Sequence, residues 1–401
     1  MSDFELYIHI PFCMKKCDYC DFLSGVFDSN MQKRYTVALC QEITHMGGLL
    51  GHRRLSTIFI GGGTPSWLDE ADMAAIMATV RKSFTLAPDC EITIECNPGT
   101  LSASKLSTYK EIGINRISIG LQSANDDELK LLGRVHNYNR FLHTFDLVRK
   151  AGFDNVSVDI MTGLPFQTVD KLEHTLKQLA LLRPEHISAY SLIVEEGTPF
   201  YDRYKFDVVK QHAGMETEEL PTDEEAYKLY KFATTYLECK GYKRYEISNY
   251  ARGGKICRHN VGYWDRVPYL GVGLGASSLL SDMRTNNISD IYKYIDIASS
   301  LSNSSYSAKG DQSPFWDEES IQKLSRSDAM EEFMFLGLRK TDGILRSDFT
   351  AMFGCDIDGI YGPVLTALKQ KGFIEAKEGR IYLTEIGMDI SNQVLAQFLI
   401  D

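Results

Sequence analysis

The first 200 residues alternate short runs of β-branched and aliphatic residues with longer stretches of helical spacing. Around Leu172, Leu176 and Leu179, apolar residues recur every three or four positions, which predicts an amphipathic helix. Strands that alternate with helices in this way indicate a parallel sheet. Six such units predict an α/β fold built as a partial (βα)6 TIM-like barrel, with a doubly wound sheet as the alternative. The six strands are expected at residues 5–10, 56–60, 91–96, 116–122, 155–161 and 186–193.

The pattern is less regular in the next hundred residues. A helix is expected at 223–240, followed by a strand-like segment at 245–250 and a glycine-rich run at 270–276. Residues 299–314 are rich in serine, which predicts a linker or a surface loop.

The last part of the chain predicts helices from about residue 318, followed by a β-hairpin at 372–383 with its turn at Glu378-Gly379. Helices followed by a hairpin resemble a small winged-helix-like α+β module. The chain is therefore expected to contain three domains. They are a barrel over 1–220, a barrel extension over 221–300 and a C-terminal winged-helix-like domain over 315–401.

Acidic residues outnumber basic ones, with 54 Asp and Glu against 43 Lys and Arg, and the formal net charge is −11. Nonspecific nucleic-acid binding requires a basic face, and the C-terminal module shows no basic recognition helix, so no nucleic-acid partner is expected. No apolar run approaches the roughly 20 residues that span a bilayer. The start of the chain lacks the charged and apolar regions of a signal sequence, which predicts a cytoplasmic protein.

Three of the nine cysteines, Cys13, Cys17 and Cys20, follow the first expected strand in the spacing C-x3-C-x2-C. Three thiolates in one short loop can hold three irons of a [4Fe-4S] cluster, which leaves the fourth iron open to a substrate. The alternative is a zinc site with His9 as the fourth ligand. Zinc knuckles use paired C-x2-C units, and the sequence contains no second pair, so the spacing favours the cluster.

The cysteine motif resembles the signature of the radical SAM superfamily. The resemblance implies that the open iron binds S-adenosylmethionine (SAM) through the amino and carboxylate groups of SAM. One electron then cleaves the sulfonium to methionine and a 5′-deoxyadenosyl radical, while the protein positions and shields the cofactor.

Glycine and polar residues follow the expected strands at the ends where barrel enzymes bind their ligands. A Gly-Gly-Gly-Thr-Pro run follows the second strand, and glycine lets the backbone approach a ligand closely. Taken singly, each polar residue fits a solvated strand end or a surface charge better than a binding site. Taken together they form a polar ring, and the resemblance implies that the ring lines SAM. Its members are Tyr7, Gly62, Gly63, Thr64, Glu95, Gln122, Arg134 and Asp159.

A second motif, His-Asn-Val-Gly-Tyr-Trp, occupies residues 259–264. Histidine can ligate haem iron and aromatic rings can stack on a macrocycle, but the spacing alone fits a capping histidine and core aromatics better. The whole chain resembles the HemW haem chaperone family, relatives of oxygen-independent coproporphyrinogen III oxidase. In that family the motif is linked to haem binding, which implies that His259 contacts haem and is a candidate axial ligand.

The resemblance implies a function in haem delivery. The expected protein binds haem, a [4Fe-4S] cluster and SAM, and passes haem to respiratory membrane proteins through transient membrane contact, with a separate electron donor. The alternative is oxygen-independent coproporphyrinogen III oxidase, which carries a further cysteine two positions after the third and an N-terminal extension. Here Phe22 stands at the cysteine position and the chain starts six residues before Tyr7, so oxidase activity is not expected. A third hypothesis is a zinc-dependent winged-helix regulator.

Overall fold

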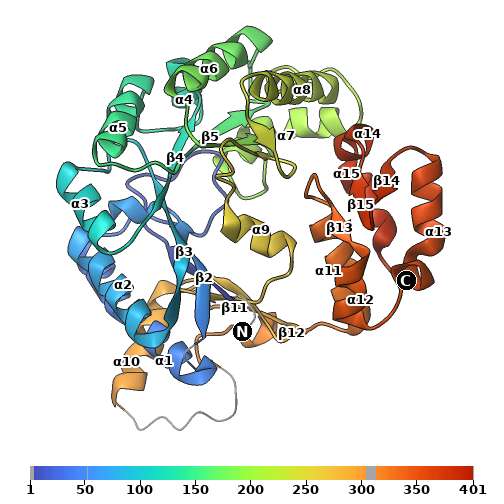
Figure 1. Cartoon of the computed structure of the whole chain (residues 1–401). Helices are drawn as coiled ribbons and strands as arrows, with labels where there is room; N and C mark the ends of the chain where they lie inside the picture. Colours follow the sequence, from blue (N-terminus) through green and yellow to red (C-terminus); the bar gives the residue numbers. More distant parts are fainter. Residues whose placement is uncertain (1–3, 52, 304–312, 401) are drawn as a thin grey trace.

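The computed structural model describes residues 4–51, 53–303 and 313–400, and its largest element is a twelve-stranded mixed sheet (Figure 1). All six strands expected from the sequence are present, although the third begins at Thr85 rather than at residue 91. Each of them pairs in parallel with the next along the chain. They are β1 (Phe4–Ile10), β2 (Arg54–Gly62), β3 (Thr85–Cys96), β4 (Arg116–Gln122), β5 (Val156–Thr162) and β6 (His186–Ser191).

Helices connect the parallel strands and surround the outside of the sheet (Figure 1). One face of the sheet packs against these helices, and the other face lines the barrel interior. A strand such as β1 is therefore buried at six of its seven positions. The structure confirms the α/β fold class with a partial (βα)6 barrel. The connecting helices are α1 (Ser29–Leu50), α2 (Glu70–Ser83), α3 (Ala103–Glu111), α4 (Asp126–Leu131), α5 (Tyr138–Lys150) and α6 (Val169–Leu182).

A seventh parallel strand, β9 (Tyr269–Val272), lies on the free side of β1. Glu5 pairs with Tyr269 and Ile8 with Val272. The strand contains Gly271, where a Cβ atom would lie 2.1 Å from the carbonyl oxygen of Ser277, so this position requires glycine. The glycine-rich run is therefore a buried strand that extends the barrel from a distant part of the sequence.

The remaining elements of the middle region complete the two edges of the sheet, with antiparallel strands beyond β6 and β9. The helix expected at 223–240 is present. These elements are α7 (Pro199–His212), α8 (Asp223–Cys239), β7 (Lys243–Arg244), β8 (Asn249–Ala251), α9 (Arg258–Trp264), β10 (Ser277–Leu280), β11 (Met283–Asn286), α10 (Ile291–Asn303) and β12 (Gln322–Lys323).

Two expectations for this region are corrected. Of the strand expected at 245–250, only the last two residues are in a strand, β8, and residues 245–248 form the connection from β7, where the Glu246 carboxylate accepts the backbone N–H of Ser248 (2.8 Å). The serine-rich loop expected at 299–314 is helical in its first five residues, which belong to α10, while residues 304–312 lie outside the described residues.

The C-terminal module has its own hydrophobic core and a three-stranded sheet in the order β13-β15-β14. The expected hairpin is present, and Glu378 and Gly379 form its turn with positive φ values of 53° and 77°. The domain boundaries at 220, 300 and 315 stay predictions. The elements of the module are α11 (Arg326–Gly337), β13 (Ile344–Leu345), α12 (Arg346–Phe353), α13 (Ile357–Gln370), β14 (Ile374–Lys377), β15 (Arg380–Leu383), α14 (Glu385–Asp389) and α15 (Ser391–Leu395).

A buried carboxyl group on α1 holds the added strand and its neighbours against the barrel. Glu42 accepts hydrogen bonds from the backbone N–H of Gly273 (2.8 Å), the Asn287 side chain (2.6 Å) and the Tyr294 hydroxyl. Glu42 is 1% exposed, and burial raises the pKa of its carboxyl to about 7. One side chain thus connects α1, the turn after β9 and α10.

The raised pKa of Glu42 predicts a pH-dependent contribution to stability. The folded protein binds a proton at Glu42 that the unfolded chain releases near pH 4.5, so this contribution decreases as the pH rises from about 4.5 to about 7. In the wild type this change in unfolding free energy between about pH 4.5 and about pH 7 is on the order of 3 kcal/mol, and it should be absent in Glu42→Gln. Denaturant unfolding at several pH values measures it, with Glu238→Gln, at an exposed helix position, as the control. Parallel pH profiles for wild type and Glu42→Gln would contradict the prediction.

Candidate functional site

The three motif cysteines lie in the loop that follows β1. Backbone hydrogen bonds shape this loop: the N–H of Cys13 donates to the Gly25 carbonyl (2.9 Å), and the N–H of Cys20 donates to the Cys17 carbonyl (3.2 Å). All three thiols line one cavity of about 320 Å³. Burial raises the pKa of Cys20, and the neighbouring Cys17 and Cys13 thiols raise it further. The loop therefore brings all three cysteine side chains to the wall of one cavity.

The glycine turn after β2 packs directly against the cysteine loop. The N–H of Gly63 donates to the Ile10 carbonyl (2.8 Å), and the N–H of Thr64 donates to the Phe12 carbonyl (2.7 Å). A Cβ atom on Gly63 would lie 2.8 Å from the Phe12 carbonyl oxygen and 3.1 Å from the Cys13 sulfur. The close packing of the cysteine loop therefore explains by itself why this position is a glycine.

A polar network joins the cysteine loop to the ends of β3 and β4. The Cys13 sulfur lies 3.6 Å from the Thr64 hydroxyl, which accepts a hydrogen bond from the Asn97 side chain (2.7 Å). The Arg134 guanidinium donates to Asn97 Oδ1 (2.6 Å) and lies 3.5 Å from the Cys17 sulfur. The network therefore links the cysteine loop through Thr64, Asn97 and Arg134 to the neighbouring strand ends.

Two half-buried carboxyl groups line the same cavity. Glu95 accepts the backbone N–H of Gly62 (3.2 Å), and burial, reinforced by the nearby Asp159 carboxylate, raises the pKa of Glu95 to about 8. Burial also raises the pKa of Asp159, whose carboxylate accepts the Ser118 hydroxyl (3.0 Å). These groups give the cavity acceptors for ammonium and hydroxyl donors of a ligand.

Gln122 reaches the cavity through a strained backbone. Its φ of 72° lies in the left-handed region, and the pairing of β4 with β5 shifts register between Gly120 and Gln122. A non-glycine residue in this region costs about 1–3 kcal/mol and is typical of ligand sites. The bulge turns the end of β4 so that Gln122 lines the cavity.

Tyr7 and His9 lie behind the cavity and do not line it. The Leu23 carbonyl accepts from His9 Nε2 (2.8 Å), so Nε2 carries the proton and Nδ1 accepts the Tyr7 hydroxyl (3.0 Å). Both ring nitrogens of His9 are therefore engaged. Across residues 4–51, 53–303 and 313–400, no three His, Cys, Asp or Glu side chains converge closely enough for a single metal ion. His9 therefore has no free ring nitrogen with which to act as the fourth ligand of a zinc site in this structure.

The cavity includes residues that the sequence analysis did not assign to it. Asn97 stands two positions after Glu95 in the same Glu-Cys-Asn-Pro run, which is the signal that could have found it. Phe22, at the position of the oxidase family's extra cysteine, is 65% exposed at the cavity edge. The unassigned lining residues are Lys15, Tyr19, Phe22, Cys96, Asn97, Ser118, Gly120, Met161 and Tyr190.

His259 lies at the opposite end of the strands from the cysteines. Its ring is 1% exposed, with Nδ1 2.7 Å from the Thr57 hydroxyl and Nε2 2.9 Å from the Tyr263 hydroxyl. The ring also stacks on Phe59, with centroids 5.2 Å apart. Burial lowers the pKa of His259 to about 3, so the imidazole is neutral. Both nitrogens are occupied in this structure, and iron ligation would require the release of one of them.

Comparisons with known proteins cover nearly the whole chain. A family model of the radical SAM superfamily matches residues 7–179, and a model of the HemN C-terminal domain matches residues 324–390. The haem chaperone HemW of Bacillus subtilis (strain 168) is 38% identical over 394 residues, which is 98% of each chain. The chain belongs to the HemW haem chaperone family.

Other members of the HemW family and one solved structure agree with this assignment. HemW of Haemophilus influenzae is 32% identical over 400 residues, covering 98% of this chain and 97% of that protein. The coproporphyrinogen III oxidase HemN of Escherichia coli, a radical SAM enzyme, superimposes with a TM-score of 0.81 at 23% identity, covering 99% of this chain and 90% of that one. At this identity the HemN similarity supports the fold alone.

Membership of the HemW family places the chain in the radical SAM superfamily, which implies a [4Fe-4S] cluster and SAM. The residues present fit both groups. Cys13, Cys17 and Cys20 are free thiols that line one cavity. Thiolates around one tetrahedral zinc ion lie about 3.8 Å apart, given the usual zinc–sulfur length, whereas a cubane cluster holds its ligands farther apart. Three thiols in one cavity match the three cysteine ligands of a cluster that keeps one iron open.

The contact between Gly63 and the cysteine loop predicts the effect of adding a methyl group. Gly63→Ala should displace the loop, lower the unfolding free energy of the metal-free protein by about 1–3 kcal/mol and reduce the iron bound after reconstitution. Gly48→Ala is the control, because nothing lies within 4 Å of a Cβ atom at that helical position. Thermal unfolding and iron analysis measure the two effects. If Gly63→Ala had the wild-type unfolding free energy and bound the wild-type amount of iron, the contact would be unnecessary for stability and for iron binding.

The burial of His259 predicts a structural effect that is separable from haem ligation. His259→Ala should lower the unfolding free energy by about 3 kcal/mol, since it removes a stacked ring and leaves the Thr57 and Tyr263 hydroxyls without their partner. His174→Ala, at an exposed helix position, is the control. In the folded variant, a shifted haem Soret band would support ligation by His259, and an unchanged band would exclude it.

Proposed function

We propose that this chain is a haem chaperone that holds a [4Fe-4S] cluster on Cys13, Cys17 and Cys20, binds SAM in the adjacent cavity, and delivers bound haem to respiratory membrane proteins. The observation that carries the proposal is the convergence of three free thiols and a ring of strand-end polar residues on one cavity. The nearly full-length similarity to haem chaperones supports the haem-binding part.

The residues around the cavity have distinct proposed roles. When bound, the cluster supplies an electron and an open iron for the amino and carboxylate groups of SAM. Thr64 and Arg134 hold the cysteine thiolates through their contacts with Cys13 and Cys17. Glu95 and Asp159 accept hydrogen bonds from the amino and hydroxyl donors of SAM.

The backbone around the glycine turn and the strained strand end complete the proposed SAM site. Gly62 and Gly63 leave space for a ligand beside the backbone at this wall of the cavity, because neither carries a side chain. Gln122 offers both an amide donor and an acceptor from the end of β4. Tyr7 supports the site from behind through His9 rather than from the cavity surface. Whether bound SAM is cleaved depends on the electron donor.

The proposed haem delivery places the chain in the cytoplasm with transient contact to a membrane. None of the helices that the structure describes combines the length and the hydropathy needed to cross a lipid bilayer. The proposed partners are haem, haem-accepting respiratory membrane proteins and an electron donor, with no nucleic acid among them.

A metal and SAM assay tests the cluster part of the proposal. After anaerobic reconstitution the protein should contain about four irons with matching acid-labile sulfide, and SAM should change the paramagnetic signal of the reduced cluster. Cys17→Ala should lose most of the bound iron and most of the SAM-dependent signal. Cys239→Ala, which removes an exposed cysteine outside the loop, should keep the iron and the signal. Zinc without iron or sulfide would overturn the proposal.

A transfer assay tests the haem part. The chain, loaded with haem, should pass it to a haem-free respiratory membrane protein in vesicles, measured as growth of the acceptor's absorption spectrum. The same preparation should not convert coproporphyrinogen III to protoporphyrinogen IX under anaerobic conditions, since Phe22 replaces the additional cysteine. Turnover of coproporphyrinogen III without haem transfer would identify the chain as the oxidase instead.

A further inference from the structure

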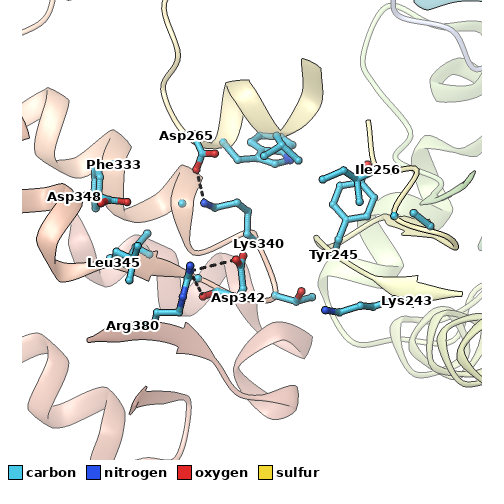
Figure 2. A pocket seen from close by; sticks show the side chains of 18 of the residues that line it. Lys243, Tyr245, Ile256, Asp265, Phe333, Lys340, Asp342, Leu345, Asp348 and Arg380 are labelled. Atoms are coloured by element: carbon cyan, nitrogen blue, oxygen red, sulfur yellow. Dashed lines mark hydrogen bonds and ion pairs between the residues drawn. The ribbon is translucent and has the colours of Figure 1, made fainter. Parts of the chain in front are cut away.

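A second and larger cavity of about 910 Å³ lies between the barrel extension and the C-terminal module (Figure 2). The α9 helix and the loops around β7 and β8 form one side, while α11, β13 and α12 form the other. Ligand cavities for drug-sized molecules span about 300–1,000 Å³. This cavity lies near the upper end of that range, whereas the cysteine cavity, at about 320 Å³, lies near the lower end.

The two sides of the larger cavity present apolar surfaces to one another. Ile256 and Tyr245 lie on the barrel side, and Phe333 and Leu345 lie on the side of the C-terminal module (Figure 2). Trp264 of α9 adds an indole to the lining, and its Nε1 atom is buried without a hydrogen-bond partner in the described structure. A buried donor of this kind is costly unless a ligand or solvent satisfies it.

Basic side chains surround the apolar surfaces. Lys340 pairs with Asp265, and Arg380 pairs with Asp342 (3.2 Å), as Figure 2 shows. Lys243 lines the cavity from β7, is exposed, and makes no ion pair within the described residues. An ammonium group that lacks an acidic partner is available to the carboxylate of a ligand.

We infer that this cavity binds a flat, mainly apolar macrocycle that carries carboxylates, namely the haem of the proposed function, on which this inference rests. The apolar sides bury the faces of the ring, and Lys243 binds a propionate at the open edge. The cysteine cavity suits this ligand poorly, because its volume of about 320 Å³ is about a third of that of the larger cavity, at about 910 Å³.

The inferred site lies on the other face of α9 from His259. Val261 and Trp264 line the larger cavity, while His259 points to Thr57 and the barrel interior. The His-Asn-x-x-Tyr-Trp motif therefore forms one wall of the haem site through its later residues. Its histidine holds α9 in position from behind.

Two substitutions in the full-length protein test the site, with ferric haem and its dimethyl ester as probes. Lys243→Glu should weaken binding of haem about tenfold and leave binding of the ester within about twofold, since the ester has no carboxylate to recognise. Ile256→Trp should weaken both probes about tenfold, because the indole occupies the space of the ring. Lys82→Glu and Leu181→Trp, both at exposed positions outside the cavity, are the matched controls.

The outcomes separate this inference from the proposed function. If the wild-type protein binds haem and both variants bind it as the controls do, the cavity is not the haem site, although the proposed function stands. If the wild-type protein does not bind haem, the proposed function and the cavity assignment both fall. Circular dichroism of Ile256→Trp checks its fold, and Lys243→Glu, at an exposed position, tests the site independently.

Discussion

The contact between two backbone turns, the cysteine loop after β1 and the glycine turn after β2, determines the geometry of the site. Hydrogen bonds from Gly63 and Thr64 to carbonyls of the first turn bring the two segments so close that no Cβ atom fits at Gly63. This contact sets the position of Cys13 relative to Thr64, and through Thr64 relative to Asn97 and the ends of β3 and β4. Parallel pairing of β1 with β2 makes the contact possible, because it brings the carboxyl ends of both strands to the same edge.

Burial in the cavity next to this contact changes the protonation equilibrium of its two carboxyl groups, Glu95 and Asp159. Burial raises the pKa of both Glu95 and Asp159, and the Asp159 carboxylate raises the pKa of Glu95 further. A cationic group that enters the cavity favours the ionised forms, so binding of an ammonium or sulfonium ligand is coupled to proton release. A neutral or anionic ligand gains nothing from this coupling. The carboxyl groups of the cavity thus favour a positively charged ligand, while Arg134 lies against the Cys17 sulfur in the same cavity (3.5 Å).

The sequence revealed the parts of the fold and site whose causes are local. The six strands are recognisable because each is a short run rich in apolar residues. The cysteine loop is recognisable because its three cysteines fall within eight residues. Strand β9 was missed, since the run at 270–276 with its three glycines has little strand propensity, and its first residues become a strand through pairing with β1. Asn97 was missed because distant residues, Thr64 and Arg134, define its role. The motif around His259 was recognised, but spacing alone does not tell which face of α9 its ring occupies.

A chain of hydrogen bonds through the barrel interior connects the two cavities. Tyr245, which lines the larger cavity, lies 2.8 Å from His186 Nε2, and His186 Nδ1 lies 2.8 Å from the Ser157 hydroxyl, which is 3.4 Å from Asp159. Burial lowers the pKa of His186, so the ring is neutral with one donor and one acceptor nitrogen. The donors then run in one direction: Tyr245 to His186, His186 to Ser157, and Ser157 to the Asp159 carboxylate. Protonation of Asp159 replaces a charged acceptor at the end of this series by a weaker neutral one, which weakens the hydrogen bond from Ser157. A series of side-chain hydrogen bonds therefore joins a carboxyl group of the cysteine cavity to a tyrosine of the larger cavity.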